Sequence, residues 1–197
     1  MAFSAVYQNL EPEKTFDTIW ASLPENIHNR IKQILKPIKT YCHWCAVIDP
    51  KRIPHVTLRY LGYHSPELQN QMIQDKNKFT AAAKEYLPIK TTLGEIGSWE
   101  SPDPRQLRVY WKINSSSIRR LHQDFLKIDN YSFFTSLEGA NFNPHITLSR
   151  VNLAIPYAEE NVTAYFEKLR TAEMEFEITT LELNFVPSLE ENFQVKL

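Results

Sequence analysis

The sequence predicts an α+β fold in which two similar lobes are built from one chain. Strand-like and helix-like segments alternate along it, and one short motif occurs twice, nearly half a chain apart. Apolar residues make up 43% and charged residues 23% of the composition, which is typical of a globular protein rather than a disordered one. A length of 197 residues suits one generous domain, so we expect residues 1–197 to form a single bilobal unit.

Six segments have the alternation or the apolar runs of β-strands. In the last of them the apolar positions change phase between Ile178 and Leu181, which predicts a β-bulge at that point. The predicted strands are Ala2–Tyr7, His43–Ile48, His55–Leu61, Leu107–Ile113, His145–Val151 and Phe176–Phe185.

Four segments repeat apolar residues at helical spacing. The clearest begins after Ser65, a favourable N-cap residue, with Pro66 at the first helical position. Ser115 or Ser116 is expected to cap the third helix, and the fourth lies near Ala158–Leu169. The residues expected to face the core are Ile27, Ile31, Ile34 and Leu35; Leu68, Met72, Phe79, Ala83 and Leu87; Ile118, Leu121, Phe125 and Ile128; and Val162, Tyr165, Phe166 and Leu169.

Charge and composition exclude several function classes. The net charge is −1, from 22 basic and 23 acidic residues, whereas a protein that coats long nucleic acid needs a large positive field. A nucleic-acid substrate is therefore expected to be small, a terminus, or bound by a local patch. With four glycines and no phosphate-binding glycine motif, a P-loop or dinucleotide fold is not expected. The sequence shows no secretory signal and no membrane-length apolar stretch, which indicates a cytoplasmic protein.

The two cysteines form a C-x-x-C pair at Cys42 and Cys45. This spacing occurs in redox and zinc sites, but no second ligand pair accompanies it. On the strand predicted there, the two side chains would point to opposite faces. We therefore interpret them as small buried apolar residues.

The repeated motif is P-H-x-T-L, at Pro54–Arg59 and Pro144–Ser149. Side chains on a strand alternate between faces, so His55, Thr57 and Arg59 are predicted to share a polar face. A single His-x-Thr is usually only a solvated strand face. Two copies, each at a strand start in its own half of a chain with six histidines, favour a functional site. In the second copy the shared face is formed by His145, Thr147 and Ser149.

Paired histidines suit phosphodiester chemistry. One imidazole can take a proton from the attacking oxygen while the other gives a proton to the leaving oxygen. The hydroxyls of Thr57 and Thr147 can donate to the non-bridging phosphoryl oxygens, and Arg59 would add positive charge there. A catalytic metal generally needs three or more ligands, and neither motif has an Asp, Glu or Cys at ligand spacing. We therefore expect no metal and no cofactor.

The segments PHVTLRYLG and FNPHITLSRV resemble the two signature motifs of the 2H phosphoesterase superfamily, and the chain is most similar to its 2′-5′ RNA ligase-like members, which are RNA 2′,3′-cyclic phosphodiesterases. The resemblance implies two pseudo-symmetric lobes of antiparallel sheet, with outer helices around a central cleft. It also implies no metal, and substrates that are cyclic phosphate ends, 2′-5′ linked oligonucleotides or related small nucleotides. The implied catalytic residues are His55, Thr57, His145 and Thr147.

Aromatic residues near such a cleft are candidates for stacking on bases. Tyr63 and Trp99 are favoured, and Arg59 and Ser149 join them as predicted substrate-binding residues. The chain departs from the family pattern in two long connections, which could be lids or plain surface loops. These connections are Gln8–Pro24 and Gly94–Arg105. The full set of candidate base-stacking residues is Tyr41, Trp44, Tyr63, Trp99 and Phe142.

Three functions are compatible with the sequence. The first is hydrolysis of 2′,3′-cyclic phosphate RNA ends or 2′-5′ linkages. The second is the same chemistry on cyclic or 2′-5′ oligonucleotide immune messengers, which the near-neutral charge mildly favours. The third is a nucleotide or RNA-end binding module without catalysis. The intact motif pair disfavours the third, because phosphate binding alone calls for arginines rather than titrating histidines. No membrane partner or extended nucleic acid is expected, and the oligomeric state is left open.

Overall fold

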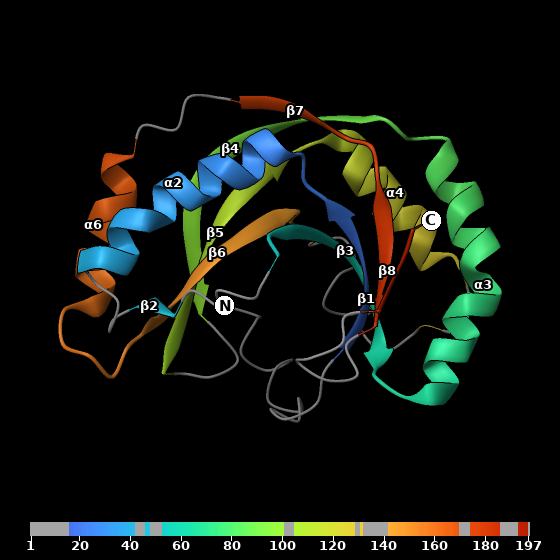
Figure 1. Cartoon of the computed structure of the whole chain (residues 1–197), viewed down its shortest axis with the longest axis horizontal. Coiled ribbons are helices and arrows are strands. Elements are labelled where there is room, and N and C mark those ends of the chain that lie inside the picture. Colours follow the sequence, from blue (N-terminus) through green and yellow to red (C-terminus); the bar gives the residue numbers. More distant parts are fainter. Residues whose placement is uncertain are drawn as a thin grey trace.

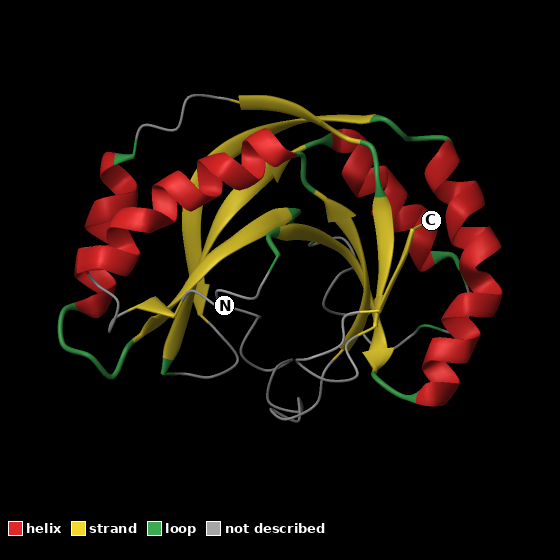
Figure 2. Cartoon of the chain, in the orientation of Figure 1, coloured by secondary structure: helices red, strands yellow, loops and turns green. Residues whose placement is uncertain are grey.

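The strands form one curved sheet with the helices along its outer side (Figures 1 and 2). The structure is a computed structural model that describes residues 16–41, 46–47, 53–100, 105–128, 131, 142–169, 174–185 and 193–196. The predicted α+β class is confirmed. The elements are β1 (Phe16–Ser22), α2 (Glu25–Tyr41), β2 (Ala46–Val47), β3 (His55–Tyr63), α3 (Pro66–Lys84), β4 (Ile89–Glu100), β5 (Gln106–Asn114), α4 (Ser116–Leu126), β6 (His145–Asn152), α6 (Ala158–Lys168), β7 (Met174–Ile178), β8 (Leu181–Phe185) and β9 (Phe193–Lys196).

The sheet has a pseudo-two-fold arrangement. Its strand order is β7-β4-β5-β6-β3-β1-β8-β9, with β2 added beside β6. In each half, the strand that carries the repeated motif pairs antiparallel with a strand that precedes it in the sequence: β3 with β1, and β6 with β5. The next strand outward is β8 beside β1 in one half and β4 beside β5 in the other. Helices α3 and α4 cover β3, while α6 covers β6 (Figure 1).

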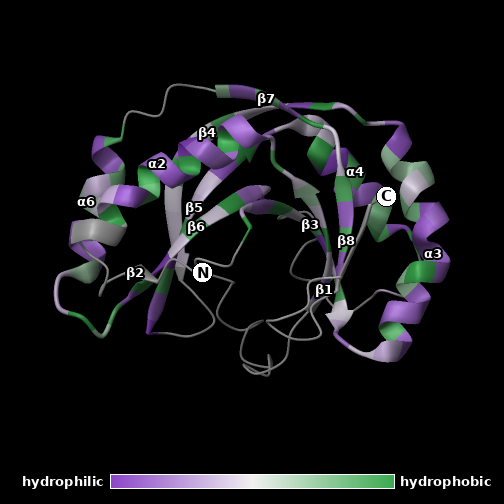
Figure 3. Cartoon of the chain, viewed as in Figure 1, coloured by the Kyte–Doolittle hydropathy of each residue, from purple (hydrophilic) through white to green (hydrophobic). Residues whose placement is uncertain are grey.

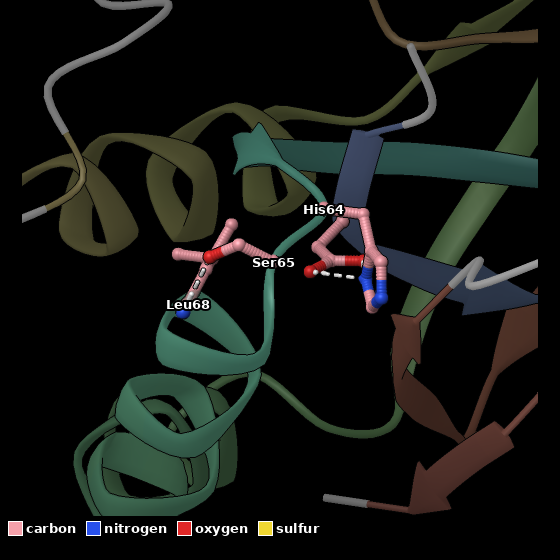
Figure 4. Close-up of polar contacts among 4 residues, drawn as sticks. His64, Ser65 and Leu68 are labelled. Atoms are coloured by element: carbon pink, nitrogen blue, oxygen red, sulfur yellow. Dashed lines mark hydrogen bonds and ion pairs between the residues drawn. The ribbon is translucent and has the colours of Figure 1, made fainter.

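The helices begin where local chemistry predicts. Ser65 Oγ accepts a hydrogen bond from the Leu68 backbone N–H at 3.1 Å (Figure 4), with Pro66 at the start of α3. Ser115 caps α4 in the same way, accepting from Ile118 N–H at 3.3 Å. Each cap satisfies one N–H that the helix itself leaves without a partner. The helices carry apolar and polar residues on different sides (Figure 3), and none of those in the described ranges is both long and apolar enough to cross a membrane.

Three sequence predictions need correction. The phase change between Ile178 and Leu181 is not a bulge: β7 pairs with β4 at one end of the sheet, and β8 pairs with β1 in the other half. Two further strands, β1 and most of β4, occupy segments that the sequence pattern assigns to loops or lids. Strand β9 is also missing from the strands that the sequence pattern predicts. The predicted strand Ala2–Tyr7 lies outside the described residues, and only Ala46–Val47 of His43–Ile48 is described as a strand.

A buried polar chain ties the motif strand β3 to helix α3. The Arg59 guanidinium donates to the Tyr131 backbone carbonyl, and the Tyr131 hydroxyl donates to Asp75 Oδ2 at 3.0 Å. Arg59, Tyr131 and Asp75 are 1%, 2% and 3% exposed. Hydrogen bonds from Lys78, Gln71 and Tyr131 hold the pKa of the Asp75 carboxyl below its ordinary value, although burial opposes them. The same burial, together with Asp75, raises the pKa of Tyr131, which therefore stays a hydrogen-bond donor.

We predict that Asp75→Asn destabilises the protein by on the order of 1 kcal/mol at pH 7, because it weakens charge-assisted hydrogen bonds. A carboxyl whose pKa is lowered in the folded state contributes stability above its unfolded pKa and loses it as the pH falls through the folded pKa. The difference between the two proteins should therefore shrink below about pH 4. Urea unfolding at several pH values measures it.

Asp124→Asn is the matched control. Asp124 also has a lysine three residues later and a tyrosine hydroxyl as partners, Lys127 and Tyr86, but its side chain is 28% exposed against 4% for Asp75. Its effect should be the smaller of the two because solvent screens the charge. Equal effects of the two substitutions would contradict a special role for the buried chain.

Candidate active site

The two motif strands meet at one residue pair. Val56 of β3 lies opposite Ile146 of β6, and both side chains are fully buried. Neighbours of such a pair on each strand point to the other side of the sheet, so both motif histidines and both motif threonines share that side. His55 and His145 are diagonal neighbours across the pair, a relation that corresponds to about 7 Å between Cβ atoms. This surface is called the histidine face, and it is defined by His55, Thr57, His145 and Thr147.

Each imidazole is held in the same way. His55 Nδ1 lies 2.8 Å from the carbonyl oxygen of Ile53, and His145 Nδ1 lies 2.8 Å from that of Asn143. A carbonyl oxygen can only accept, so Nδ1 carries the hydrogen in both rings. Nε2 is then the nitrogen that can take up or give away a proton. Both histidines are half-buried, and their equal geometry follows from the repeated motif.

Trp20 packs against His55 and is itself held by the buried carboxylate of Glu182. The Trp20 ring packs on the His55 ring with centroids 4.1 Å apart. Trp20 Nε1 donates to Glu182 Oε2 at 3.1 Å, and Ser22 Oγ donates to Glu182 Oε1 at 2.6 Å. Glu182 is 7% exposed, so this network fixes the indole against the imidazole. The sequence pattern does not identify Trp20, because it lies in a segment interpreted as a loop and FDTIWAS does not alternate regularly between apolar and polar residues.

An aromatic pair lies beside His145. The His145 and Trp99 rings are perpendicular, with 4.3 Å between centroids and 88° between planes. Trp99 in turn stacks on Tyr110 at 4.0 Å and 27°. Tyr110 lies opposite Thr147 in the β5–β6 ladder, and burial raises the pKa of its hydroxyl, with the charge of Glu95 adding to the effect. The predicted candidate Trp99 is therefore brought to the histidine face.

A lysine supplies positive charge next to His145. Lys112 lies directly opposite His145 in the β5–β6 ladder. Its ammonium is 3.5 Å from Glu95 Oε1, but the side chains are 34% and 78% exposed, so this ion pair is weak. No sequence pattern indicates Lys112, because its position depends on the register between strands rather than on a motif.

Arg59 and Ser149 do not lie on the histidine face, and the prediction that they do is wrong. One extra residue interrupts each ladder directly after the motif threonine: Leu58 in β3 and Leu148 in β6. A bulge of this kind turns the following residues to the other side. Arg59 and Ser149 are accordingly 1% and 3% exposed, and Arg59 binds the Tyr131 carbonyl among the helices.

Two of the other aromatic candidates also lie elsewhere. Tyr63 ends β3, eight residues beyond His55, which is about 25 Å along an extended strand. Phe142 stacks on the fully buried His122 at 3.8 Å. Trp44, Cys42, Cys45 and the side chain of Tyr41 lie outside the described residues. Within the described ranges, no group of three or more His, Cys, Asp and Glu side chains is placed to hold a metal ion.

A family model described as the 2′-5′ RNA ligase superfamily matches residues 22–184, which include both motifs. The chain belongs to this superfamily. Its members are 2H phosphoesterases, so the resemblance seen in the two motifs is confirmed at superfamily level. The match also spans nearly all of the chain from the end of β1 to β8, and therefore both halves of the sheet.

Three solved structures have a similar fold. TT0787 of Thermus thermophilus aligns with a TM-score of 0.53 at 15% identity, over 93% of this chain and 95% of that one. Escherichia coli LigT in its apo form aligns at 0.51 and 16%, over 94% and 95%. Kluyveromyces marxianus Usb1 with uridine monophosphate aligns at 0.54 and 14%, over 92% and 97%. Curated proteins yield no match.

Gly97 is predicted to be required for the aromatic pair. A Cβ atom at this position would lie 2.6 Å from the Tyr110 hydroxyl oxygen, and Tyr110 is held between Gly97 and Trp99. Gly97→Ala should therefore displace both rings next to His145, lowering kcat/KM about tenfold or more while circular dichroism stays native. Gly94→Ala is the control, because its Cβ would meet the amide of Asn114, an exposed residue that can turn away. Equal losses in both variants would refute the prediction.

Proposed function

We propose that this protein is a phosphodiesterase that hydrolyses 2′,3′-cyclic phosphate RNA ends or 2′-5′ linked oligonucleotides, with His55 and His145 as its acid and base. One observation carries the proposal: two imidazoles from separate halves of the sheet lie diagonally across one ladder pair, each anchored through Nδ1. Membership of a phosphoesterase superfamily supports it. So does the shared fold of a yeast relative whose structure contains a mononucleotide.

The proposed reaction on a cyclic phosphate is an in-line displacement at phosphorus. Nε2 of one histidine takes a proton from the attacking water as the new P–O bond forms. Nε2 of the other, protonated, histidine gives its proton to O3′ as the P–O3′ bond breaks, which leaves a 2′-phosphate. The first histidine ends protonated and the second neutral, so a proton exchange with solvent resets the pair.

The negative charge on the non-bridging oxygens needs partners throughout the reaction. The hydroxyls of Thr57 and Thr147 lie on the same face as the imidazoles and can donate to those oxygens. Lys112, opposite His145, takes the place that the motif predicts for Arg59. With these donors we propose that no metal takes part, and activity should therefore survive EDTA.

Replacement of either histidine is the direct test. His55→Ala and His145→Ala should each lower kcat by about 10²- to 10⁴-fold, the usual contribution of a general acid or base, while the affinity for a non-hydrolysed nucleotide changes little. His28→Ala on α2, a half-buried histidine of the helical layer, is the matched control and should keep full activity. If His55→Ala and His145→Ala keep the wild-type rate, the mechanism is excluded.

The substrate is identified with a panel whose products are separated by mass. The panel contains cyclic-phosphate RNA ends, 2′-5′ oligoadenylate and cyclic oligonucleotides. Each compound tests a different candidate substrate class. Turnover of the first two supports the proposal as stated. Turnover of cyclic messengers alone would favour the immune-messenger alternative. Binding without turnover of any member would favour the non-catalytic binding module.

A pair of histidines with opposite roles predicts a bell-shaped dependence of kcat/KM on pH. The acidic limb reports the base, which must be neutral, and the alkaline limb reports the acid, which must be protonated. Both limbs should fall in the range where imidazole titrates, between about pH 5 and 8. Profiles of slow variants with one histidine replaced should each lose one limb, which assigns the roles. A rate that rises or falls monotonically in the wild type would contradict the two-histidine mechanism.

A further inference from the structure

We infer that the buried carboxylate of Glu182 is a positioning group for His55, which it holds in place and favours in the protonated form. It acts through two side chains of β1, Trp20 and Ser22. The inference rests on the proposed function, which makes His55 one of the two groups that transfer a proton. It goes further because it gives the two histidines different proton affinities before any substrate binds.

The carboxylate reaches His55 through the strand that lies between them. Strand β1 has β8, which carries Glu182, on one side and β3, which carries His55, on the other (Figure 1). Trp20 Nε1 donates to one carboxylate oxygen at 3.1 Å, and Ser22 Oγ donates to the other at 2.6 Å. Ser22 lies directly opposite His55 in the β1–β3 ladder, and the Trp20 ring packs on the His55 ring. Both donors to the carboxylate are therefore also neighbours of the imidazole.

Burial restrains these contacts. Glu182 is 7% exposed and Trp20 is 6% exposed. A carboxylate removed from water destabilises the fold unless donors satisfy it, so a movement of Trp20 or Ser22 would leave the carboxylate without compensation. The same burial leaves little of the indole surface for a nucleobase. The Trp20 ring is thus a support for His55 rather than a stacking platform for a substrate.

The charge of Glu182 and the indole both favour a proton on His55. Positions two strands apart in a sheet are separated by about 10 Å, and a buried negative charge at such a distance favours a positive one. The Trp20 and His55 ring centroids are 4.1 Å apart, and a cation this close to an indole ring is attracted by its π-system. Lys196, opposite Glu182 in β9, has a position one strand further from His55. Of the two charged positions, that of Glu182 is therefore the nearer.

The surroundings of His145 have the opposite sign. Lys112 lies directly opposite His145, where the other half of the sheet has a serine. The residue opposite the neighbouring aromatic side chain is Glu182 in one half and Gly97 in the other. Glu95, 3.5 Å from the Lys112 ammonium, is 78% exposed, so solvent screens its charge. The two imidazoles are diagonal neighbours, and a proton on one disfavours a proton on the other. The free protein is therefore expected to protonate His55 before His145.

Proton NMR titration of the imidazole Hε1 signals tests the inference without a substrate. The signals missing from His55→Ala and from His145→Ala identify the two rings. In the wild type, His55 should titrate at higher pH than His145, and the Trp20 ring should shift its signals upfield. Glu182→Gln should lower the His55 midpoint by about 0.5 pH unit or more and change that of His145 less. It should retain the upfield shift, because the glutamine oxygen can accept from Trp20 and its amide can donate to Ser22.

Two further variants test the positioning itself. Glu182→Ala removes both acceptors as well as the charge, so it should lower the His55 midpoint and also reduce the upfield shift. Trp20→Phe keeps an aromatic ring but loses the N–H donor. Both should lower kcat about tenfold while KM stays within about twofold. In Glu182→Gln one limb of the pH profile should move to lower pH while the other stays. Glu175→Gln, at an exposed glutamate of β7, is the control and should change none of these values.

An unchanged His55 midpoint in Glu182→Gln, or equal changes at both histidines, would overturn the inference. Circular dichroism and the thermal unfolding midpoint show whether each variant is folded, and Trp20→Phe decides if the Glu182 variants are not. Because the titration involves no turnover, it separates the two proposals. A lowered His55 midpoint in a protein that hydrolyses nothing in the panel would uphold the role of Glu182 and reject the hydrolase. Hydrolysis by a protein whose His55 titration does not depend on Glu182 would do the reverse.

Discussion

The candidate site depends on the single pairing of Val56 with Ile146 between β3 and β6. Both side chains are fully buried, so neither strand can shift by one residue without moving a β-branched apolar side chain out of the core and a histidine into it. The same pair joins the two halves of the sheet. One constraint therefore fixes the relative position of two imidazoles that are far apart in the sequence.

Features that depend on local chemistry could be predicted from the sequence. The strand alternation of the two P-H-x-T-L copies, the caps at Ser65 and Ser115, and the core-facing stripes of the helices all follow from residues within a few positions of each other. The pairing of the halves was suggested by the repeat alone. These local rules are the reason that each histidine could be placed on the same strand face as its own threonine without coordinates.

Features that depend on register could not be predicted. Lys112 and Trp20 reach the histidine face because β5 and β1 align with the motif strands at particular residues, and no local pattern encodes that alignment. The segment from Phe176 to Phe185 has the alternation of one strand, yet its two parts pair with β4 and β1 at separate places in the sheet. Periodicity identifies a strand face, but it does not identify the neighbouring strand.

The bulges at Leu58 and Leu148 show that the two halves share backbone geometry beyond the residues of the repeated motif. Both follow the motif threonine, and both turn the next residue toward the helices, although that residue is Arg59 in one half and Ser149 in the other. The polar run on the histidine face therefore ends after His-x-Thr in each half. What differs between the halves is supplied by the neighbouring strand: Ser22 opposite His55, and Lys112 opposite His145. The two motif strands thus form a symmetric frame for the proposed acid and base, while the different residues on the neighbouring strands would orient an asymmetric substrate.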